Sequence, residues 1–156
     1  WLETTMTTLR ARDVLDQAHA FHAQLAGYFA GLSDSSGNER VRLLYSYLSQ
    51  HEQQLSQVLN RYRSDAPPRL MDAWLQNVPD DRALHACAVL NLTPDTDPDE
   101  VITASLTYDD CLITLYQAMQ DASQHPEVRE FFEHLQELEQ NEKHRTSINM
   151  QSLYDW

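Results

Sequence analysis

Residues 135–145 read LQELEQNEKHR, and the spacing in this stretch decides how the chain folds. If the segment is a helix that buries Leu135, its inner face also carries Glu139 and Glu142. A helix that packs in a protein core normally places apolar side chains at such positions. Two carboxylates on an otherwise apolar face therefore predict a polar layer inside a helical protein.

The composition predicts one compact helical domain over residues 1–156. The chain has 42% hydrophobic residues, which is enough for a core of useful size. With only 3 Gly and 6 Pro, the sequence favours helix over sheet. The net charge of −13 argues against nucleic acid and against an anionic membrane surface as partners. The negative charge can serve solubility alone, attract a cationic partner or attract bound cations. The composition does not decide among these three.

Two cysteines, Cys87 and Cys111, are too few for a disulfide scaffold or a four-thiolate metal site. We expect reduced thiols in a cytoplasmic protein, with a single buried disulfide as the alternative. No apolar run reaches the length of a membrane span, and no signal peptide is visible. The sequence thus predicts a protein that does not enter the membrane.

Four segments have the apolar spacing of long helices, at about residues 12–33, 39–62, 98–122 and 126–150. Short breaks join the first two segments and the last two. The crossover between the pairs, residues 63–97, begins with Ala66-Pro67-Pro68 and is expected to contain two short helices. Asp97 before Pro98 is typical of a helix start. We therefore predict an all-α four-helix bundle made of two helical hairpins joined by a long crossover.

The two hairpins resemble each other at a constant offset of 87 residues, which indicates an internal duplication. The offset brings both loops and both apolar stripes into register. Chance similarity between two amphipathic hairpins is the alternative explanation. Matched pairs are Leu25 with Leu112, Val41 with Val128, Leu48 with Leu135 and Glu52 with Glu139.

The inner faces of the four helices carry five polar residues that fall at about one depth, given a rise of about 1.5 Å per residue. Carboxylates buried together must be protonated, hydrated, paired with a cation or bound to a metal. No Lys or Arg falls on an inner face at this depth. These five candidate metal ligands are His22, Glu52, Asp109, Glu139 and Glu142.

Three interpretations of this layer remain open: a metal site, a metal-free polar layer, and a helix register different from the one assumed. Oxygen ligands with one imidazole suit iron, manganese or zinc better than calcium or magnesium. The number of ions is open as well. One ion, or two with unequal affinity, fits the residue types.

Residues 97–144, DPDEVITASLTYDDCLITLYQAMQDASQHPEVREFFEHLQELEQNEKH, resemble the second half of rubrerythrin-type domains of the ferritin-like superfamily. The resemblance extends in layout over residues 12–150. It implies a ferritin-like bundle with a carboxylate site for two irons. It also implies pairing into a homodimer or a higher homo-oligomer, and oxidoreductase chemistry on oxygen or peroxide.

In that family, the first and third helices each give one Glu, and the second and fourth each give a Glu-x-x-His pair. Carried over, the resemblance assigns these roles to His22, Asp109, Glu52 with Leu55, and Glu139 with Glu142. Only two of these positions hold the family's residue, so the implied site is divergent and in part degenerate. Leu55 cannot bind a metal.

We therefore expect a ferritin-like metal-binding protein, with iron or manganese as cofactor, that acts on oxygen or peroxide. The alternative is a catalytically inactive ferritin-like domain that serves as a partner-binding or assembly module. Iron storage in a large shell is a third hypothesis, and nothing in the sequence specifies cage contacts. Two cysteines cannot form a rubredoxin-like iron centre, so an electron-donor protein would be a separate partner.

Other residues are weaker candidates. His51 and His144 lie one step from the inner faces and are expected to face solvent. Tyr108 and Tyr116 lie near the polar layer, either as redox-active neighbours or as core residues. Trp74 is expected to anchor the crossover.

Overall fold

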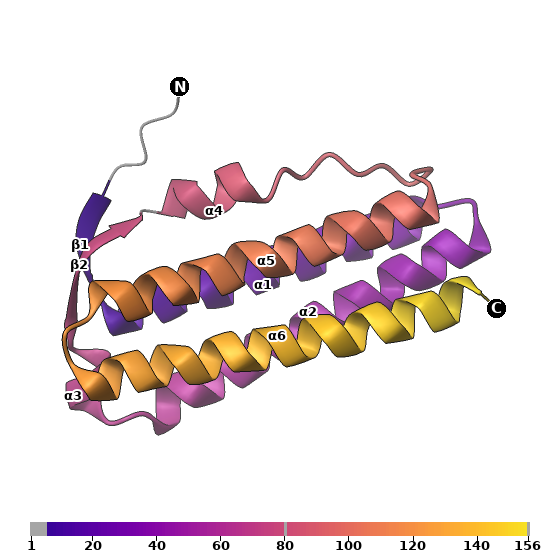
Figure 1. Cartoon of the computed structure of the whole chain (residues 1–156). Helices are drawn as coiled ribbons and strands as arrows, with labels where there is room; N and C mark the ends of the chain where they lie inside the picture. Colours follow the sequence, from indigo (N-terminus) through magenta and orange to yellow (C-terminus); the bar gives the residue numbers. More distant parts are fainter. Residues whose placement is uncertain (1–5, 80, 156) are drawn as a thin grey trace.

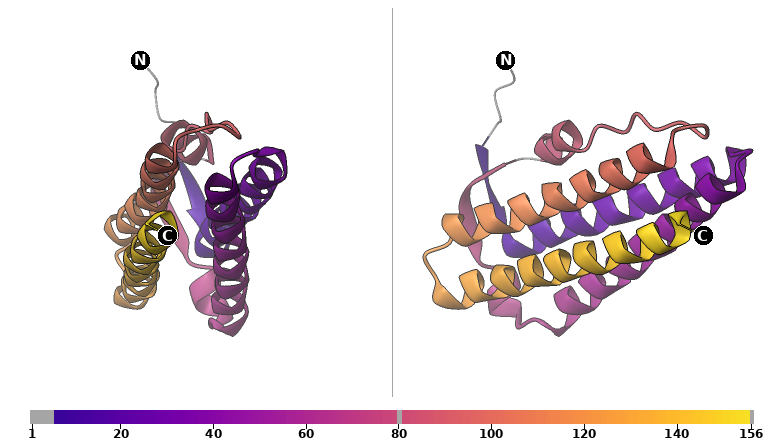
Figure 2. Two further views of the ribbon diagram at one scale, coloured as in Figure 1. Left: turned by 90° about the vertical axis from the view of Figure 1, so that its right-hand side faces the viewer. Right: turned by 45° about the vertical axis from the view of Figure 1, so that its right-hand side comes forward.

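The computed structural model describes residues 6–79 and 81–155, and in them four long helices form a bundle. They are α1 (Ala11–Ser35), α2 (Glu39–Asp65), α5 (Pro98–Ala122) and α6 (Pro126–Tyr154). Figure 1 shows them side by side along their length. The end-on view in Figure 2 shows the α1–α2 hairpin beside the α5–α6 hairpin. The predicted all-α bundle of two hairpins is confirmed.

The helix ends follow from local capping chemistry. The Asn38 side chain accepts hydrogen bonds from the backbone N–H groups of Arg40 and Val41, at 3.0 and 3.2 Å, and so caps α2. Asp97 accepts from the N–H of Asp99 at 2.9 Å and caps α5, as the sequence predicted. Pro98 and Pro126 occupy the first turns of α5 and α6, where no N–H is needed.

The helices of the two hairpins begin at matching positions, which supports the duplication. α1 and α5 start at Ala11 and Pro98, and α2 and α6 start at Glu39 and Pro126, each pair 87 residues apart. The same offset relates His22 to Asp109 and Glu52 to Glu139. One pattern repeated at one offset therefore places all four polar residues at corresponding positions of the two hairpins.

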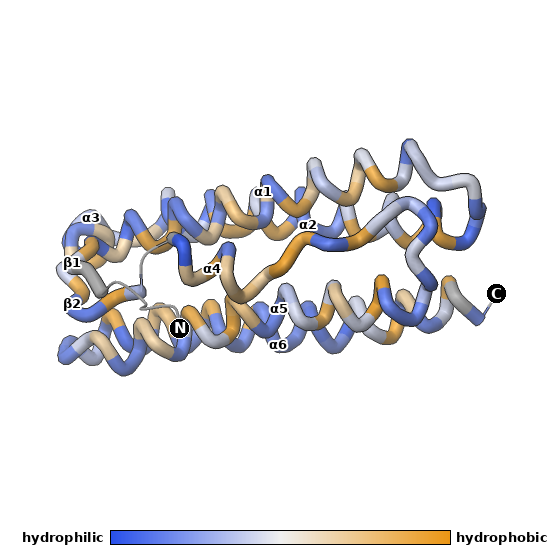
Figure 3. Tube along the Cα trace, turned by 90° about the horizontal axis from the view of Figure 1, so that it is seen from above, coloured by the Kyte–Doolittle hydropathy of each residue, from blue (hydrophilic) through white to orange (hydrophobic). Residues whose placement is uncertain are grey.

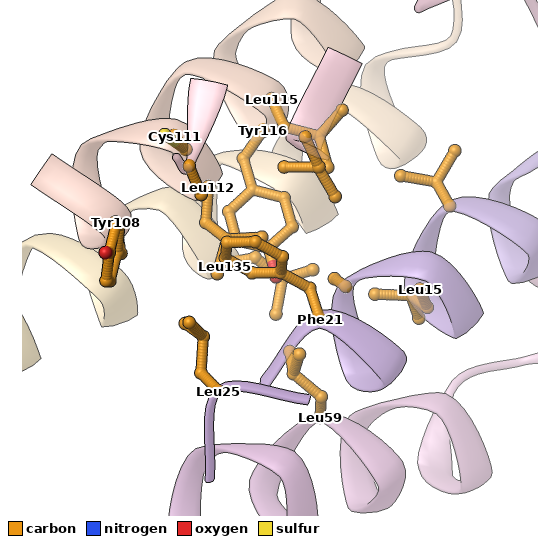
Figure 4. Packing of buried hydrophobic residues seen from close by; sticks show 14 of the residues in the cluster. Leu15, Phe21, Leu25, Leu59, Tyr108, Cys111, Leu112, Leu115, Tyr116 and Leu135 are labelled. Atoms are coloured by element: carbon orange, nitrogen blue, oxygen red, sulfur yellow. The ribbon is translucent and has the colours of Figure 1, made fainter. Parts of the chain in front are cut away.

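The core lies between the two hairpins. Phe29, Leu112, Phe132 and Leu135 are fully buried in it. Figure 4 shows part of this core, with Phe21 and Leu25 of α1 facing residues of α5. Figure 3 shows apolar and polar residues alternating along every long helix. The helices thus bury one face each and expose the other.

The crossover differs from the prediction of two short helices alone. It contains α3 (Pro68–Met71), strand β2 (Trp74–Pro79) and α4 (Asp81–Cys87), and β2 pairs antiparallel with β1 (Met6–Arg10). The ribbon closes the end of the bundle where α1 begins (Figure 1). Leu75 and Val78 of β2 are fully buried, so the ribbon extends the core. Asn77 of β2 adopts a left-handed backbone conformation, with a φ of 58°. The pairing register of the two strands shifts between Thr7 and Leu9, as it does at a β-bulge.

The expectation of reduced thiols is wrong, because Cys87 and Cys111 form a disulfide. Cys87 is the last residue of α4. Its Cα lies 5.9 Å from the Cα of Cys111 on α5, a separation typical of a disulfide. The crossover packs against α5 there and brings the two sulfurs together. The sequence could not show this long-range approach.

The cytoplasmic location stays a prediction. Among the described residues, no helix combines the length and apolar content that a membrane crossing requires.

We predict that Leu48→Ala destabilises the protein by about 2–5 kcal/mol, because Leu48 is 1% exposed and its loss leaves a cavity. Leu43→Ala is the matched control on the same helix, since Leu43 is 42% exposed, and its effect should stay within about 0.5 kcal/mol. Denaturant unfolding monitored by circular dichroism measures both. Equal losses in the two variants would contradict the packing described above.

Candidate metal centre

Each long helix contributes one side chain to a buried polar layer. His22 of α1 and Glu139 of α6 have no exposed surface, and Glu52 of α2 and Asp109 of α5 are 3% and 4% exposed. Each lies on the inner face of its helix, among the apolar residues of the core. Four polar residues at this depth are uncommon in a domain of this size, because burying each one is costly.

The imidazole of His22 lies between two carboxylates. Its Nε2 is 2.8 Å from Oε1 of Glu139, and its Nδ1 makes a short hydrogen bond with Oε2 of Glu52. A neutral imidazole has one N–H and could donate to only one of these oxygens. An imidazolium has two N–H groups and donates to both. The geometry therefore fits the protonated form of His22.

The pKa of His22 is raised well above 6.5 by this arrangement. Burial acts in the opposite direction and is the largest effect, because desolvation disfavours the charged ring. The charges of Glu139 and Glu52, together with their hydrogen bonds, outweigh it. His22 thus supplies the cation that the sequence lacked at this depth.

Asp109 has the opposite role. Burial raises its pKa well above 3.8, and the charges of Glu52 and Glu139 raise it further. A carboxyl group that is desolvated next to two other acidic groups keeps its proton to a higher pH than a carboxyl group in water. In this layer His22 therefore favours its charged form and Asp109 its neutral form.

Two polar atoms near this layer lack a hydrogen-bond partner. Oε2 of Glu139 and the hydroxyl of Tyr116 are both buried and unpaired. An unpaired buried polar group costs about 1–3 kcal/mol. The charge of Glu139 contributes to the raised pKa of Tyr116, after burial as the main cause, so the two groups interact. Oε2 of Glu139 is thus a buried oxygen of the layer that is available for a ligand.

The structure places Glu142 away from this group. Glu142 is partly exposed and forms an ion pair with Arg145 on the edge of α6. Its other oxygen lies 3.9 Å from Nδ1 of His51. Leu55, one turn after Glu52 on α2, is 3% exposed and contributes an apolar side chain with no metal-binding atom. Four of the five candidate residues are thus buried in the layer, and Glu142 lies beside it.

The expectation that His51 faces solvent is wrong. His51 is 7% exposed, and its Nε2 lies 2.9 Å from the hydroxyl of Thr146. Its ring also stacks on Tyr47, with centroids 6.2 Å apart. Thr146 is a polar residue on the inner face of α6. This feature of the sequence could have indicated that a polar side chain such as His51 lies opposite it.

One further expectation is corrected. Trp74 does not anchor the crossover, because it is 58% exposed and its ring lies under the guanidinium of Arg10, at 4.7 Å. Tyr108 is a core residue, 2% exposed, which is one of its two expected roles, and its hydroxyl donates to the carbonyl of Val89 in the crossover at 3.0 Å.

The side chains as they stand do not form a metal-binding group. Within residues 6–79 and 81–155, no three His, Cys, Asp or Glu side chains are arranged to hold a metal ion. The reason is visible in the layer itself, since the ring of His22 fills the space between Glu52 and Glu139. A metal would have to take the place that the imidazolium holds.

We predict that stability falls as pH rises above 6.5 in chelator-treated protein. The folded-state pKa of His22 lies above its unfolded value of 6.5, so its contribution is complete below pH 6.5 and is lost as pH rises through the raised pKa. His22 alone contributes a slope of at most about 1.4 kcal/mol per pH unit, and Asp109, whose pKa is also raised, adds a fall of the same sign. Denaturant unfolding between pH 6.5 and 9 measures it.

His22→Gln should flatten this slope, and His144→Gln, at an exposed position of α6, should leave it unchanged. The same slope in wild type and in His22→Gln would show that His22 is not the group that titrates.

Comparison with known proteins supports the fold. No family model matches the chain, and no curated protein matches it. A crystal structure from Thermotoga maritima matches with a TM-score of 0.58 and 14% sequence identity, over 91% of this chain and 95% of the other. That protein is provisionally described as a ferritin-like diiron-carboxylate protein. At this level of identity the likeness establishes the fold alone, and the chain has a ferritin-like fold.

Proposed function

We propose that this protein is a ferritin-like metal-binding protein that holds one iron or manganese ion in the buried polar layer. The proposed ligands are His22, Glu52, Asp109 and Glu139. The observation that carries the proposal is the convergence of these four buried side chains from four helices, with Oε2 of Glu139 left without a partner. One nitrogen and several carboxylate oxygens form a donor set suited to these metals.

The donor set fits one ion better than two. A pair of irons in ferritin-like proteins takes about four carboxylates and two imidazoles. Here Leu55 occupies one imidazole position, and Glu142 is paired with Arg145. The proposal therefore does not require Glu142 as a ligand.

Four residues of this chain would act when the ion binds. Glu52 and Glu139 would hold the ion through their carboxylate oxygens, and His22 would be the nitrogen donor once its proton had passed to solvent. Asp109 would add an oxygen donor after losing its proton to solvent in the same way. The burial of all four excludes bulk water from the layer. Bound iron or manganese would supply the one-electron redox chemistry with which an oxidoreductase acts on oxygen or peroxide.

We propose further that the functional protein is a homodimer or a higher homo-oligomer and that it receives electrons from a separate donor protein. The family resemblance supports the first statement. The disulfide supports the separate electron donor. Both cysteines are in it, so neither can ligate an iron centre through which electrons would enter this protein.

We predict that protein purified without chelators or a histidine tag contains about one equivalent of iron or manganese, since the donor set suits one ion. The double variant Glu52→Gln/Glu139→Gln should lose it, because both carboxylates become neutral amides. Glu133→Gln/Glu137→Gln changes the charge equally at exposed positions of α6 and should retain the metal. Mass spectrometry of metal content measures all three. Retention of metal by the Glu52/Glu139 variant would contradict the proposed ligand set.

We also predict that metal binding releases protons and weakens as pH falls. His22 and Asp109 both hold a proton in the metal-free protein because their pKa values are raised. Manganese binding should therefore release about two protons per ion at neutral pH. Calorimetric titration in two buffers that differ in ionisation enthalpy counts these protons. Release of no protons would mean that the ion binds elsewhere.

The second candidate function is a metal-free ferritin-like module that binds a partner or assists assembly. Its supporting observation is that His22 already satisfies one oxygen of each carboxylate, so the layer has an internal cation. Under this function, iron added without oxygen to metal-free protein would not be retained. Retention of iron with loss in the Glu52/Glu139 variant would exclude it.

A further inference from the structure

The crossover forms a strap, residues 82–97, that lies across the boundary between the two hairpins. Figure 3 shows α4 and the following segment between the α1–α2 pair and the α5–α6 pair, seen from above. Leu84 and Ala88 of the strap are buried, at 6% and 3% exposure. The strap therefore covers part of the core and is not a free surface loop.

Tyrosine hydroxyls and one disulfide attach the strap to the bundle. Tyr108 of α5 donates to the carbonyl of Val89 at 3.0 Å, and Tyr45 of α2 donates to that of Thr93 at 2.7 Å. Tyr28 of α1 accepts from the N–H of Leu92 at 2.7 Å. Hydrogen bonds between neutral groups contribute little individually. The Cys87–Cys111 disulfide is the covalent attachment of the strap to α5.

The disulfide is accessible from one side. Cys87 is exposed, whereas Cys111 is 3% exposed. Figure 4 shows the sulfur of Cys111 on the other side of α5 from Leu112, which points into the core. A thiol in solution can therefore reach the disulfide through Cys87 while the helix stays folded.

The strap covers residues next to the polar layer. Phe21 and Tyr108, which are 5% and 2% exposed, directly precede His22 and Asp109 in the sequence. A small cavity already separates the strap from α1. It is lined by Gln17, Ala20, Phe21 and Gln24 of α1 and by Leu84 and His85 of the strap. Movement of the strap would widen this cavity beside Phe21.

We propose that the Cys87–Cys111 disulfide is a redox latch whose reduction frees the strap and exposes the residues of α1 and α5 that it covers beside the polar layer. A thiolate of a dithiol attacks the sulfur of Cys87 and forms a mixed disulfide, and Cys111 leaves as a thiolate and takes up a proton. The second thiol of the reductant closes onto the first and releases Cys87. Two electrons and two protons pass from the dithiol to the protein.

Hydroxyl-radical footprinting with and without dithiothreitol tests the latch. The disulfide joins two residues that are 24 positions apart in the sequence. Breaking a cross-link over a loop of this length should raise the equilibrium population of the open strap about a hundredfold. We expect oxidation of Phe21 and Tyr108 to rise at least about tenfold on reduction. Tyr116, which has no exposed surface, is the internal control and should stay protected.

The variant Cys87→Ser/Cys111→Ser is the matched control. It should show the open pattern at Phe21 and Tyr108 with no reductant, and dithiothreitol should then have no effect. Unchanged oxidation of Phe21 and Tyr108 in the reduced wild type would overturn the proposal. A parallel rise at Tyr116 would overturn it as well, because the disulfide would then stabilise the whole fold and not the strap alone.

A second readout rests on the proposed function. If the layer binds metal, the reduced protein should take up manganese faster than the oxidised protein, and the serine variant should match the reduced one. Absence of binding in every sample, together with the footprinting result expected above, would reject the metal site and retain the latch. Equal uptake rates in the oxidised and reduced proteins would reject the latch as an access control for the metal.

Discussion

The hydrogen bonds from His22 to Glu52 and Glu139 are the interaction on which the interior of this bundle depends. They connect α1 to α2 and α6 across the centre of the core. Without a cation between them, the two buried carboxylates of Glu52 and Glu139 would repel each other in a medium that stabilises charge poorly. The imidazolium removes that repulsion and fixes the three helices relative to one another. The same position is where a metal ion would bind, so protonation and metal binding are alternative ways to satisfy one electrostatic requirement.

The duplication explains how the chain brings these groups together. His22 and Asp109 occupy equivalent positions in the two hairpins, as do Glu52 and Glu139. An ancestral hairpin with two inward polar residues would, on doubling, place four of them at one depth. Their identities then differ by role: His22 is the cation, Asp109 holds a proton, and Glu52 and Glu139 accept hydrogen bonds. The two hairpins therefore differ in the chemistry of these residues and not in the backbone positions that the residues occupy.

Periodicity in the sequence was sufficient to predict the four long helices, the crossover and the burial of His22, Glu52, Asp109 and Glu139, because each depends on spacing within one helix. It could not predict features that depend on contacts between distant segments. The β1–β2 ribbon and the Cys87–Cys111 disulfide join residues far apart in the chain. Likewise, the burial of His51 depends on Thr146 of another helix, and the position of Glu142 beside His51 depends on the packing of α2 against α6. The position of the His22 ring between two carboxylates depends on side-chain rotamers in three helices. The spacing of residues in the sequence does not specify these rotamers.

The most direct test of this account is diffraction at the iron absorption edge from crystals loaded with iron without oxygen. The account predicts one anomalous peak bound by Glu52 and Glu139, with the ring of His22 moved from its position between the two carboxylates. The contrary result would be density without an anomalous peak and with His22 still hydrogen-bonded to both. The imidazolium would then be the permanent cation of this core, and the protein would not be a metal-binding protein at this layer.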